Sequence, residues 1–204
     1  MSFEFDEEEF ERDVKIKVVG VGGGGGNAVE NMVRNNVEGV DFIIINTDVA
    51  ALKSKDGNTM ERVQIGRKTT KGRGAGGKPP VAAESAKENS DDIAEVLKGA
   101  SLVFVAAGMG GGTGTGAAPV IAQIAKDMGI LTVGVVTKPF DFEREFKMNL
   151  ALQGIAELRK YVDALIIVPN QRLLSIKEKN ISIKAAYAMV DNVLYQAVKG
   201  ISDL

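Results

Sequence analysis

The most constraining feature of this sequence is a glycine-rich stretch between a strand pattern and a helix pattern. Six of the nine residues 108–116 are glycine, with an apolar run at 102–107 before them and a helical pattern at 117–128 after them. Glycines allow positive φ and close approach of a ligand, and the unpaired N–H groups at a helix start attract anions. The stretch therefore predicts a phosphate cradle, and a tight turn without a ligand is the alternative.

A second glycine cluster lies in the first strand-loop-helix unit. Residues 15–21 are a short β-branched run, residues 22–26 are all glycine, and a helical pattern covers 28–35. This order is typical of nucleotide-binding α/β folds. Gly20, Gly22 and Gly25 also satisfy the dinucleotide fingerprint, so an NAD-binding Rossmann-type enzyme is the competing interpretation.

A third glycine-rich loop, residues 66–80, follows a short strand predicted at 63–65. It carries Lys71, Arg73 and Lys78, whose positive charge suits a neighbouring phosphate, although a mobile surface loop is the alternative.

Another polar segment, residues 46–48, ends the strand predicted at 41–46. Its side chains can bind a ligand at the strand end or cap the next helix, and both interpretations stay open.

Apolar runs and helical patterns alternate along the chain. Strands are predicted at 15–21, 41–46, 63–65, 102–107, 131–137 and 164–168, and helices at 28–35, 81–89, 90–98, 117–128, 145–160 and 171–176. The alternation predicts an α/β fold with a Rossmann-like, open, mostly parallel six-stranded sheet and helices on both faces. All three glycine loops follow strands, so one ligand at the carboxyl edge of the sheet can touch them all.

The two ends of the chain differ from this domain, which we expect over residues 14–180. Residues 1–13 carry seven acidic side chains and one arginine, which predicts an acidic flexible tail. Apolar residues spaced three and four apart from Ile183 to Ile201 predict one long core helix within 181–204. No stop signal precedes Leu204, so we expect a fragment of a longer chain; the family resemblance described below implies that this helix would lead to a missing C-terminal domain.

The composition excludes several classes of function. The chain has no histidine and no cysteine, which removes disulfides, thiolate chemistry and the commonest general base. A net charge of −2 and a sequence pI of about 5.4 show no basic footprint for nucleic acid. Neither a signal-peptide pattern nor an apolar run long enough to span a membrane occurs, so we expect a cytoplasmic protein without membrane insertion.

Three separate glycine loops exceed what a pyrophosphate needs, so we expect a triphosphate ligand. The sequence contains no P-loop pattern and no protein-kinase motif set. Residues 111–116, Gly-Gly-Thr-Gly-Thr-Gly, resemble the signature of the tubulin/FtsZ superfamily. Residues 20–25, 46–48, 74–77, 139–143, 168–170, 191–194 and 200–204 resemble segments of its bacterial cell-division branch, in order and spacing.

The resemblance implies a GTP site with specific roles. The phosphates would contact Gly23, Gly24, Gly25, Gly26, Asn27, Gly112, Thr113 and Gly114, and the γ-phosphate would lie near Ala75, Gly76 and Gly77. Gly111 and Thr115 of the same signature loop would also belong to the GTP site. Ribose and base would contact Glu143, Lys147 and Asn170. Tyr187 would stack on guanine and Asp191 would accept its N1–H and amino group; their four-residue spacing places them on one helix face. Without a nucleotide, Tyr187 would be a core aromatic and Asp191 a solvated charge.

Two positions depart from the family pattern on the ribose side. Lys147 stands where arginine is usual and loses the bidentate fork, and Arg144 stands where glycine is usual.

The resemblance further implies the GTP-binding domain of a filament-forming cell-division GTPase, acting in the cytoplasm at the division site. GTP or GDP would bind with Mg²⁺ held through phosphates and water, and no protein metal ligand is expected. We expect no catalytic residue in this chain, because an acidic activating loop would come from an adjacent subunit in a head-to-tail filament. The chain alone should bind GTP and hydrolyse little. Other division proteins are expected partners; an NAD-binding enzyme, a non-enzymatic GTP-dependent scaffold and tubulin itself are the alternatives.

Overall fold

The fold is described by a computed structural model that covers residues 14–54, 59–174 and 182–202. A six-stranded sheet has the strand order β3-β2-β1-β4-β5-β6, and every neighbouring pair is parallel. This confirms the open α/β sheet predicted from the sequence. The strands are β1 (Ile16–Val21), β2 (Val40–Asn46), β3 (Met60–Gln64), β4 (Leu102–Gly108), β5 (Leu131–Lys138) and β6 (Ala164–Pro169).

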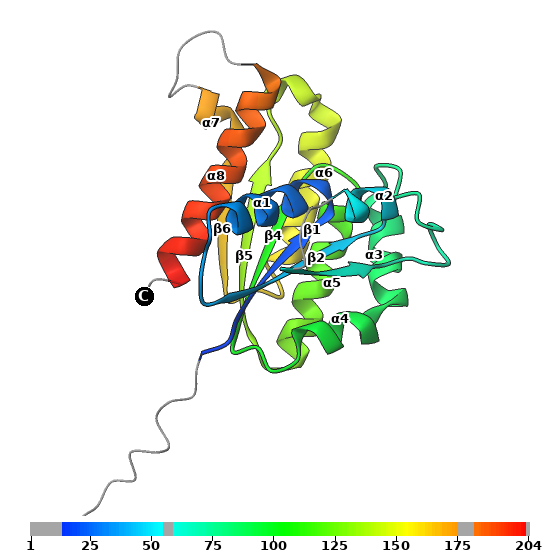
Figure 1. Cartoon of the computed structure of the whole chain (residues 1–204). Helices are drawn as coiled ribbons and strands as arrows, with labels where there is room; N and C mark the ends of the chain where they lie inside the picture. Colours follow the sequence, from blue (N-terminus) through cyan, green and yellow to red (C-terminus); the bar gives the residue numbers. More distant parts are fainter. Residues whose placement is uncertain (1–13, 55–58, 175–181, 203–204) are drawn as a thin grey trace, which may run out of the picture.

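Helices cover both faces of the sheet (Figure 1). One face packs against α1, α2 and α8, and the other packs against α3, α4, α5 and α6. The helices are α1 (Gly22–Arg34), α2 (Val49–Lys53), α3 (Pro79–Glu88), α4 (Ser90–Leu97), α5 (Thr113–Asp127), η2 (Asp141–Glu143), α6 (Glu145–Leu158), α7 (Asn170–Leu174) and α8 (Ile183–Ser202).

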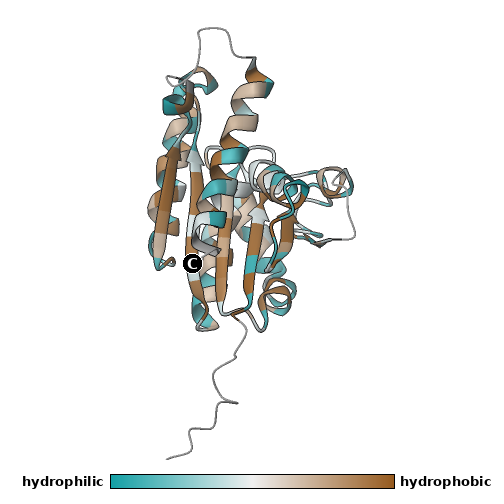
Figure 2. Ribbon diagram, turned by 60° about the vertical axis from the view of Figure 1, so that its left-hand side comes forward, coloured by the Kyte–Doolittle hydropathy of each residue, from teal (hydrophilic) through white to brown (hydrophobic). Residues whose placement is uncertain are grey.

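The central strand β4 shows why the sheet needs both helix layers. Its residues from Leu102 to Ala107 are all buried, with Val103 and Val105 facing one core and Phe104 facing the other. A parallel strand that is covered on both faces is apolar throughout, which explains the uninterrupted apolar run in the sequence. Figure 2 shows largely hydrophobic strands between helices in which hydrophilic and hydrophobic residues alternate.

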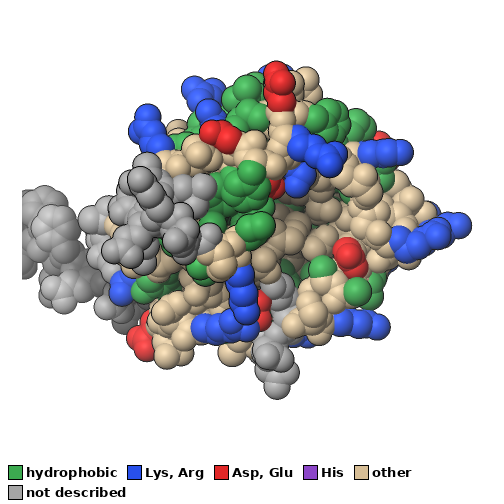
Figure 3. Space-filling view, turned by 90° about the horizontal axis from the view of Figure 1, so that it is seen from above, with side chains coloured by type: hydrophobic (Ala, Val, Ile, Leu, Met, Phe, Trp, Pro, Cys, Tyr) green, Lys and Arg blue, Asp and Glu red, His purple; other side chains and the backbone are tan. Residues whose placement is uncertain are grey.

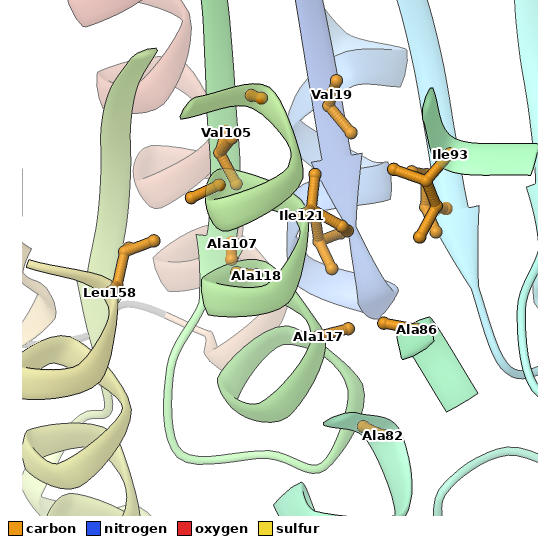
Figure 4. Close-up of a cluster of buried hydrophobic side chains, with 14 of the residues drawn as sticks. Val19, Ala82, Ala86, Ile93, Val105, Ala107, Ala117, Ala118, Ile121 and Leu158 are labelled. Carbon is orange, nitrogen blue, oxygen red and sulfur yellow. The ribbon is translucent and has the colours of Figure 1, made fainter. Parts of the chain in front are cut away.

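The core beneath the α3–α5 layer is built from small side chains. Ala82 and Ala86 of α3 belong to one buried cluster with Ala117, Ala118 and Ile121 of α5, and Figure 4 shows Ala86 beside Ala117. Small residues let two helices approach closely, and this face therefore packs backbone near backbone. A Cβ at Gly116 would overlap the carbonyl oxygen of Pro79, so that glycine serves helix packing.

The register of the sheet aligns the ends of the strands. Val21 pairs with Ile45 and with Ala107, and Ala107 pairs with Val136. The loops after these strands consequently lie along one edge. The strand order reverses between β1 and β4, which are neighbours, and ligands in open α/β sheets bind outside the carboxyl ends at such a point.

Some sequence predictions differ from the observed elements. Helix α1 begins at Gly22 instead of 28, and α5 begins at Thr113 instead of 117, so much of each glycine stretch is the first turn of a helix. Glycine disfavours helices intrinsically, and only contacts with the neighbouring strands make this possible. Asn89, and not Ser90, precedes α4 as its N-cap. The predicted tail at 1–13 and the domain boundary at 180 lie outside the described residues.

Candidate functional site

Two of the glycine loops meet at the switch point of the sheet. A Cβ on Gly24 would lie 3.3 Å from the Cα of Gly108, and a Cβ on Gly22 would lie 2.9 Å from the backbone N of Gly114. The β1–α1 and β4–α5 turns thus touch backbone to backbone. Both helices point their amino ends at this spot, and the partial positive charge of a helix start makes it suitable for phosphates.

The glycines of the first loop have different roles. Gly25 is buried, and a Cβ there would overlap the carbonyl oxygen of Ala106 in β4. Gly23 is exposed and has nothing within 4 Å of its Cβ direction. Gly23 and Gly26 line a small cavity of about 120 Å³ together with Asn27 and the end of β2. Gly25 therefore serves packing, whereas Gly23 faces space that a ligand can occupy.

Side chains brace the loop that leads into α5. The backbone N–H of Gly110 donates to the Thr115 hydroxyl at 2.8 Å, and Gly110 has a φ of +104°. The hydroxyls of Thr113 and Thr47 lie 2.8 Å apart, which joins the loop to the end of β2. No side chain caps the N-terminus of α5 at Gly112, so its first-turn N–H groups keep their capacity for an anion. Thr115 thus contributes by holding the loop.

The third loop is tied to the same edge. The N–H of Gly74 donates to the carbonyl of Thr47 at 3.1 Å, and the Thr70 hydroxyl donates to that carbonyl at 3.2 Å. Gly76 and Gly77 both have positive φ, and a Cβ on Gly112 would lie 3.2 Å from the carbonyl carbon of Gly77. The loop containing Ala75, Gly76 and Gly77 therefore abuts the β4–α5 turn.

The polar end of β2 serves as a cap. The Asp48 carboxylate accepts from the backbone N–H of Ala50 at 2.8 Å and of Ala51 at 3.3 Å, which starts α2. Thr47 is fully buried and bonds to Thr113. Of the two interpretations of this segment, the capping interpretation therefore holds for Asp48, while Thr47 links two loops.

A cavity of about 190 Å³ extends from the glycine loops toward α8. It brings together residues that are far apart in the sequence, among them Gly24, Asn27, Gly111, Glu143, Lys147, Asn170, Tyr187 and Asp191. Asn170, the first residue of α7, is 3% exposed, and its Oδ1 has no hydrogen-bond partner among the described residues. A buried unpaired acceptor is costly, so this atom is suited to a donor on a ligand.

Glu143 is the polar centre of this cavity. Its carboxylate accepts from the backbone N–H of Phe140 at 3.1 Å and from the Lys147 ammonium at 3.1 Å. Tyr187 also lies near Glu143, and partial burial together with this carboxylate raises the pKa of the Tyr187 hydroxyl to about 12. The Tyr187 ring packs edge-on against buried Phe140, with centroids 5.3 Å apart. Both partners hold the ring at the cavity wall.

Arg144 has an unusual backbone that the sequence does not reveal. Its φ is +81° and its ψ is 144°, a conformation that essentially only glycine adopts without strain. Such strain costs on the order of 1–3 kcal/mol. The only sequence signal is that glycine is usual at this position in the family that the chain resembles. Thr137 and Gly108 also line the cavity, and their positions at strand ends are the signal that finds them.

Not every predicted site residue lines the hollows at the glycine-loop edge of the sheet. Gly23, Gly24, Gly26, Asn27, Gly77, Gly111, Glu143, Lys147, Asn170, Tyr187 and Asp191 line the connected hollows at this edge. Gly25 is packed against β4, and Thr115 lines a separate cleft between α3, α5 and α6. Seen from above, the face is hollowed near its middle, and Lys and Arg side chains stand around the hollow (Figure 3).

Residues 15–178 match the family model of the Tubulin/FtsZ family, GTPase domain. The chain belongs to the tubulin/FtsZ family. The cell division protein FtsZ of Wigglesworthia glossinidia brevipalpis is 55% identical over 178 residues, which make up 87% of this chain and 46% of that protein. That of Pseudomonas aeruginosa is 56% identical over 178 residues, or 87% of this chain and 45% of the relative. The chain thus spans about half the length of the curated relatives it matches.

Solved structures agree with this membership of the tubulin/FtsZ family. An empty FtsZ dimer of M. jannaschii superimposes with a TM-score of 0.88 at 41% identity, covering 94% of this chain and 55% of that one. CetZ2 from Haloferax volcanii has the same fold, with a TM-score of 0.80 at 24% identity over 92% of this chain and 57% of that one. These matches confirm the resemblance seen in the sequence and lend no support to the NAD-binding alternative. No helix in the described ranges is both long and apolar enough to cross a membrane.

Proposed function

We propose that this chain is the GTP-binding domain of a filament-forming cell-division GTPase. The observation that carries the proposal is the cavity that joins the glycine loops to Asn170, Tyr187 and Asp191. Its phosphate end consists of backbone N–H groups at the starts of two helices. Its base end offers an aromatic ring and acceptor groups, which is the pairing that a guanine nucleotide needs.

The base end favours guanine for a chemical reason. A carboxylate only accepts hydrogen bonds, and guanine presents two adjacent donors, its N1–H and its amino group. Adenine has an acceptor at N1, which the Asp191 carboxylate would repel. The buried Oδ1 of Asn170 supplies a further acceptor near the same cavity. The Tyr187 ring, which is 38% exposed, offers a face on which the base can stack.

The phosphate end fits a nucleotide bound with Mg²⁺. Among the described residues, no group of three or more acidic side chains gathers to hold a metal ion. Mg²⁺ commonly binds through one or two protein groups, nucleotide phosphates and water. The glycine loops and Thr113 would position the phosphates and leave the metal to be coordinated by phosphate oxygens and water. The metal would offset negative charge that develops during phosphoryl transfer.

Hydrolysis and assembly are proposed at the level of the whole protein. Phosphoryl transfer depends mainly on positioning and electrostatics, which these loops supply. We assign no water-activating group to this chain and expect it from an adjacent subunit of a head-to-tail filament. The chain alone should therefore bind GTP and release phosphate slowly. Cytoplasmic assembly at the division site, with other division proteins as partners, is part of this proposal.

The test is the nucleotide preference of the purified chain, measured calorimetrically with GTP, ATP and NAD. GTP should bind more tightly than the other two. Asp191→Ala should weaken GTP binding by about 10-fold to 100-fold, because unpaired polar groups on a bound ligand cost about 1–3 kcal/mol. Asp127→Ala is the matched control. It also removes one carboxylate, but Asp127 is exposed at the C-terminal end of α5, whereas the glycine loop precedes the N-terminal end of that helix. An unchanged Kd for GTP in Asp191→Ala removes Asp191 from the site, and tighter binding of NAD overturns the proposal.

A further inference from the structure

A cavity of about 500 Å³ opens beside the proposed nucleotide cavity. The two cavities share the lining residues Gly111, Glu143, Lys147 and Tyr187, so they are continuous. The larger one adds Gly77 and Gly110 from two glycine loops to its lining. Arg144 also lines it, together with Phe142 and Phe146. A ligand that reaches from the glycine loops into this cavity would therefore come near Arg144.

The charged side chains that line this cavity carry a net positive charge. Its titratable lining groups other than Tyr187 are Glu143, Arg144 and Lys147. The Glu143 carboxylate and the Lys147 ammonium form an ion pair at 3.1 Å and largely neutralise each other. Among the residues that the structure describes, the Arg144 guanidinium has no ion pair or hydrogen bond to any group. One uncompensated positive charge thus belongs to a residue that lines the cavity, with five N–H donors available to an anion.

The backbone of Arg144 makes this placement costly. Its φ of +81° and ψ of 144° belong to a region where a side chain is strained and glycine is not. Strained residues of this kind gather at ligand sites, where the side chain does something that glycine cannot do. The strain, the uncompensated charge and the continuity with the glycine loops are three separate observations on the same residue.

Building on the proposed function, we infer that Arg144 is a specificity residue that binds the phosphate chain of the nucleotide. A guanidinium matches phosphate geometry with two parallel hydrogen bonds, and the attraction grows with the number of phosphate charges. Arg144 thereby favours GTP over GDP. It positions the phosphates opposite the N–H groups of the glycine loops and also makes nucleotide affinity dependent on salt.

Three substitutions separate the charge of Arg144 from its strain. Arg144→Gln removes the charge and keeps the strain, Arg144→Lys keeps both, and Arg144→Gly removes both. Arg159→Gln is the matched control. Arg144 precedes helix α6 and Arg159 follows it, so this variant removes an exposed positive charge at the opposite end of that helix. Each variant is first checked for folding by circular dichroism. The Kd values for GTP and GDP are then measured by calorimetry at low and at high salt.

Arg144→Gln and Arg144→Gly should weaken GTP binding by about tenfold and GDP binding less, and should flatten the salt dependence. Arg144→Lys should retain most of the affinity, and Arg159→Gln should match the unmodified chain. If the unmodified chain binds GTP and Arg144→Gln binds it within twofold, the inference about Arg144 is wrong while the proposed function stands. If the unmodified chain does not bind GTP, the proposed function itself fails. Equal loss of GTP and GDP affinity without any change in salt dependence also overturns the inference, since it indicates a merely structural effect.

Discussion

Gly25 and Gly23 lie two residues apart in one glycine run, yet alanine should affect them in opposite ways. At Gly25 a Cβ would overlap the carbonyl oxygen of Ala106 and lie 3.1 Å from its carbonyl carbon. Carbon atoms normally pack at about 3.5–4.0 Å, and both partners here are backbone. Helix α1 must therefore shift away from β4 by on the order of 1 Å to accept the methyl group.

The expected cost follows from this overlap. Overpacking a tight site destabilises a protein by about 1–3 kcal/mol, and the better helix propensity of alanine returns up to about 1 kcal/mol. Gly25→Ala should thus lower the free energy of unfolding by about 2 kcal/mol. Gly23→Ala meets nothing within 4 Å and should leave the free energy unchanged or raise it by up to about 1 kcal/mol.

Urea denaturation, followed by circular dichroism without added nucleotide, measures both variants. With a slope of about 2 kcal/mol per molar urea, the midpoint for Gly25→Ala should fall by about 1 M, and the midpoint for Gly23→Ala should stay or rise slightly. Nucleotide is left out because a ligand that binds only the folded state would mask the difference. If the two midpoints agree within about 0.3 M, the distinction between packing and ligand-facing glycines is refuted.

Two further predictions concern the hydrogen bond between Gly110 and Thr115 and the pKa of Tyr187. Thr115→Val keeps the shape of the side chain but leaves the buried N–H of Gly110 without its acceptor. It should therefore lower the free energy of unfolding in urea by about 1–3 kcal/mol and speed amide hydrogen exchange at Gly110. Unchanged exchange would show that this bond does not hold the loop. The pKa of Tyr187 is raised to about 12 from about 10, so the folded state holds its proton to higher pH than the unfolded state. That stabilisation is complete below pH 10 and should be lost as the pH rises from about 10 to about 12. When Tm is measured at several pH values in this range, it should fall more steeply for the unmodified chain than for Tyr187→Phe. Equal slopes for the two chains would contradict the pKa shift.

Much of the fold could be predicted from local patterns. The apolar run of β4 is buried on both faces of a parallel sheet, and this leaves a signal that needs no knowledge of partners. The glycine loops were placed at one sheet edge because parallel strands end together. The spacing of Tyr187 and Asp191 was enough to put them on one face of α8, and the structure places both at the same cavity.

Other features depended on partners that are distant in the sequence. Helix α1 starts within a run of five glycines because β4 and α5 pack against it, and helix propensity alone opposes that start. The two roles left open for residues 46–48 were decided by hydrogen bonds to α2 and to Thr113. Glu143 and Tyr187 lie near each other only because α8 returns beside η2, more than forty positions later in the chain.

The sequence by itself determined the sheet and the edge where its loops gather, and it led to the prediction of a phosphate-bearing ligand, because hydrophobic period and glycine content act locally. Only the tertiary structure decided which glycines pack against backbone and which face open space, since that depends on atoms brought close by folding. It alone showed the strained backbone of Arg144 and the unpaired oxygen of Asn170. Both features are unfavourable locally, and the packed surroundings hold them at the edge where a ligand can use them.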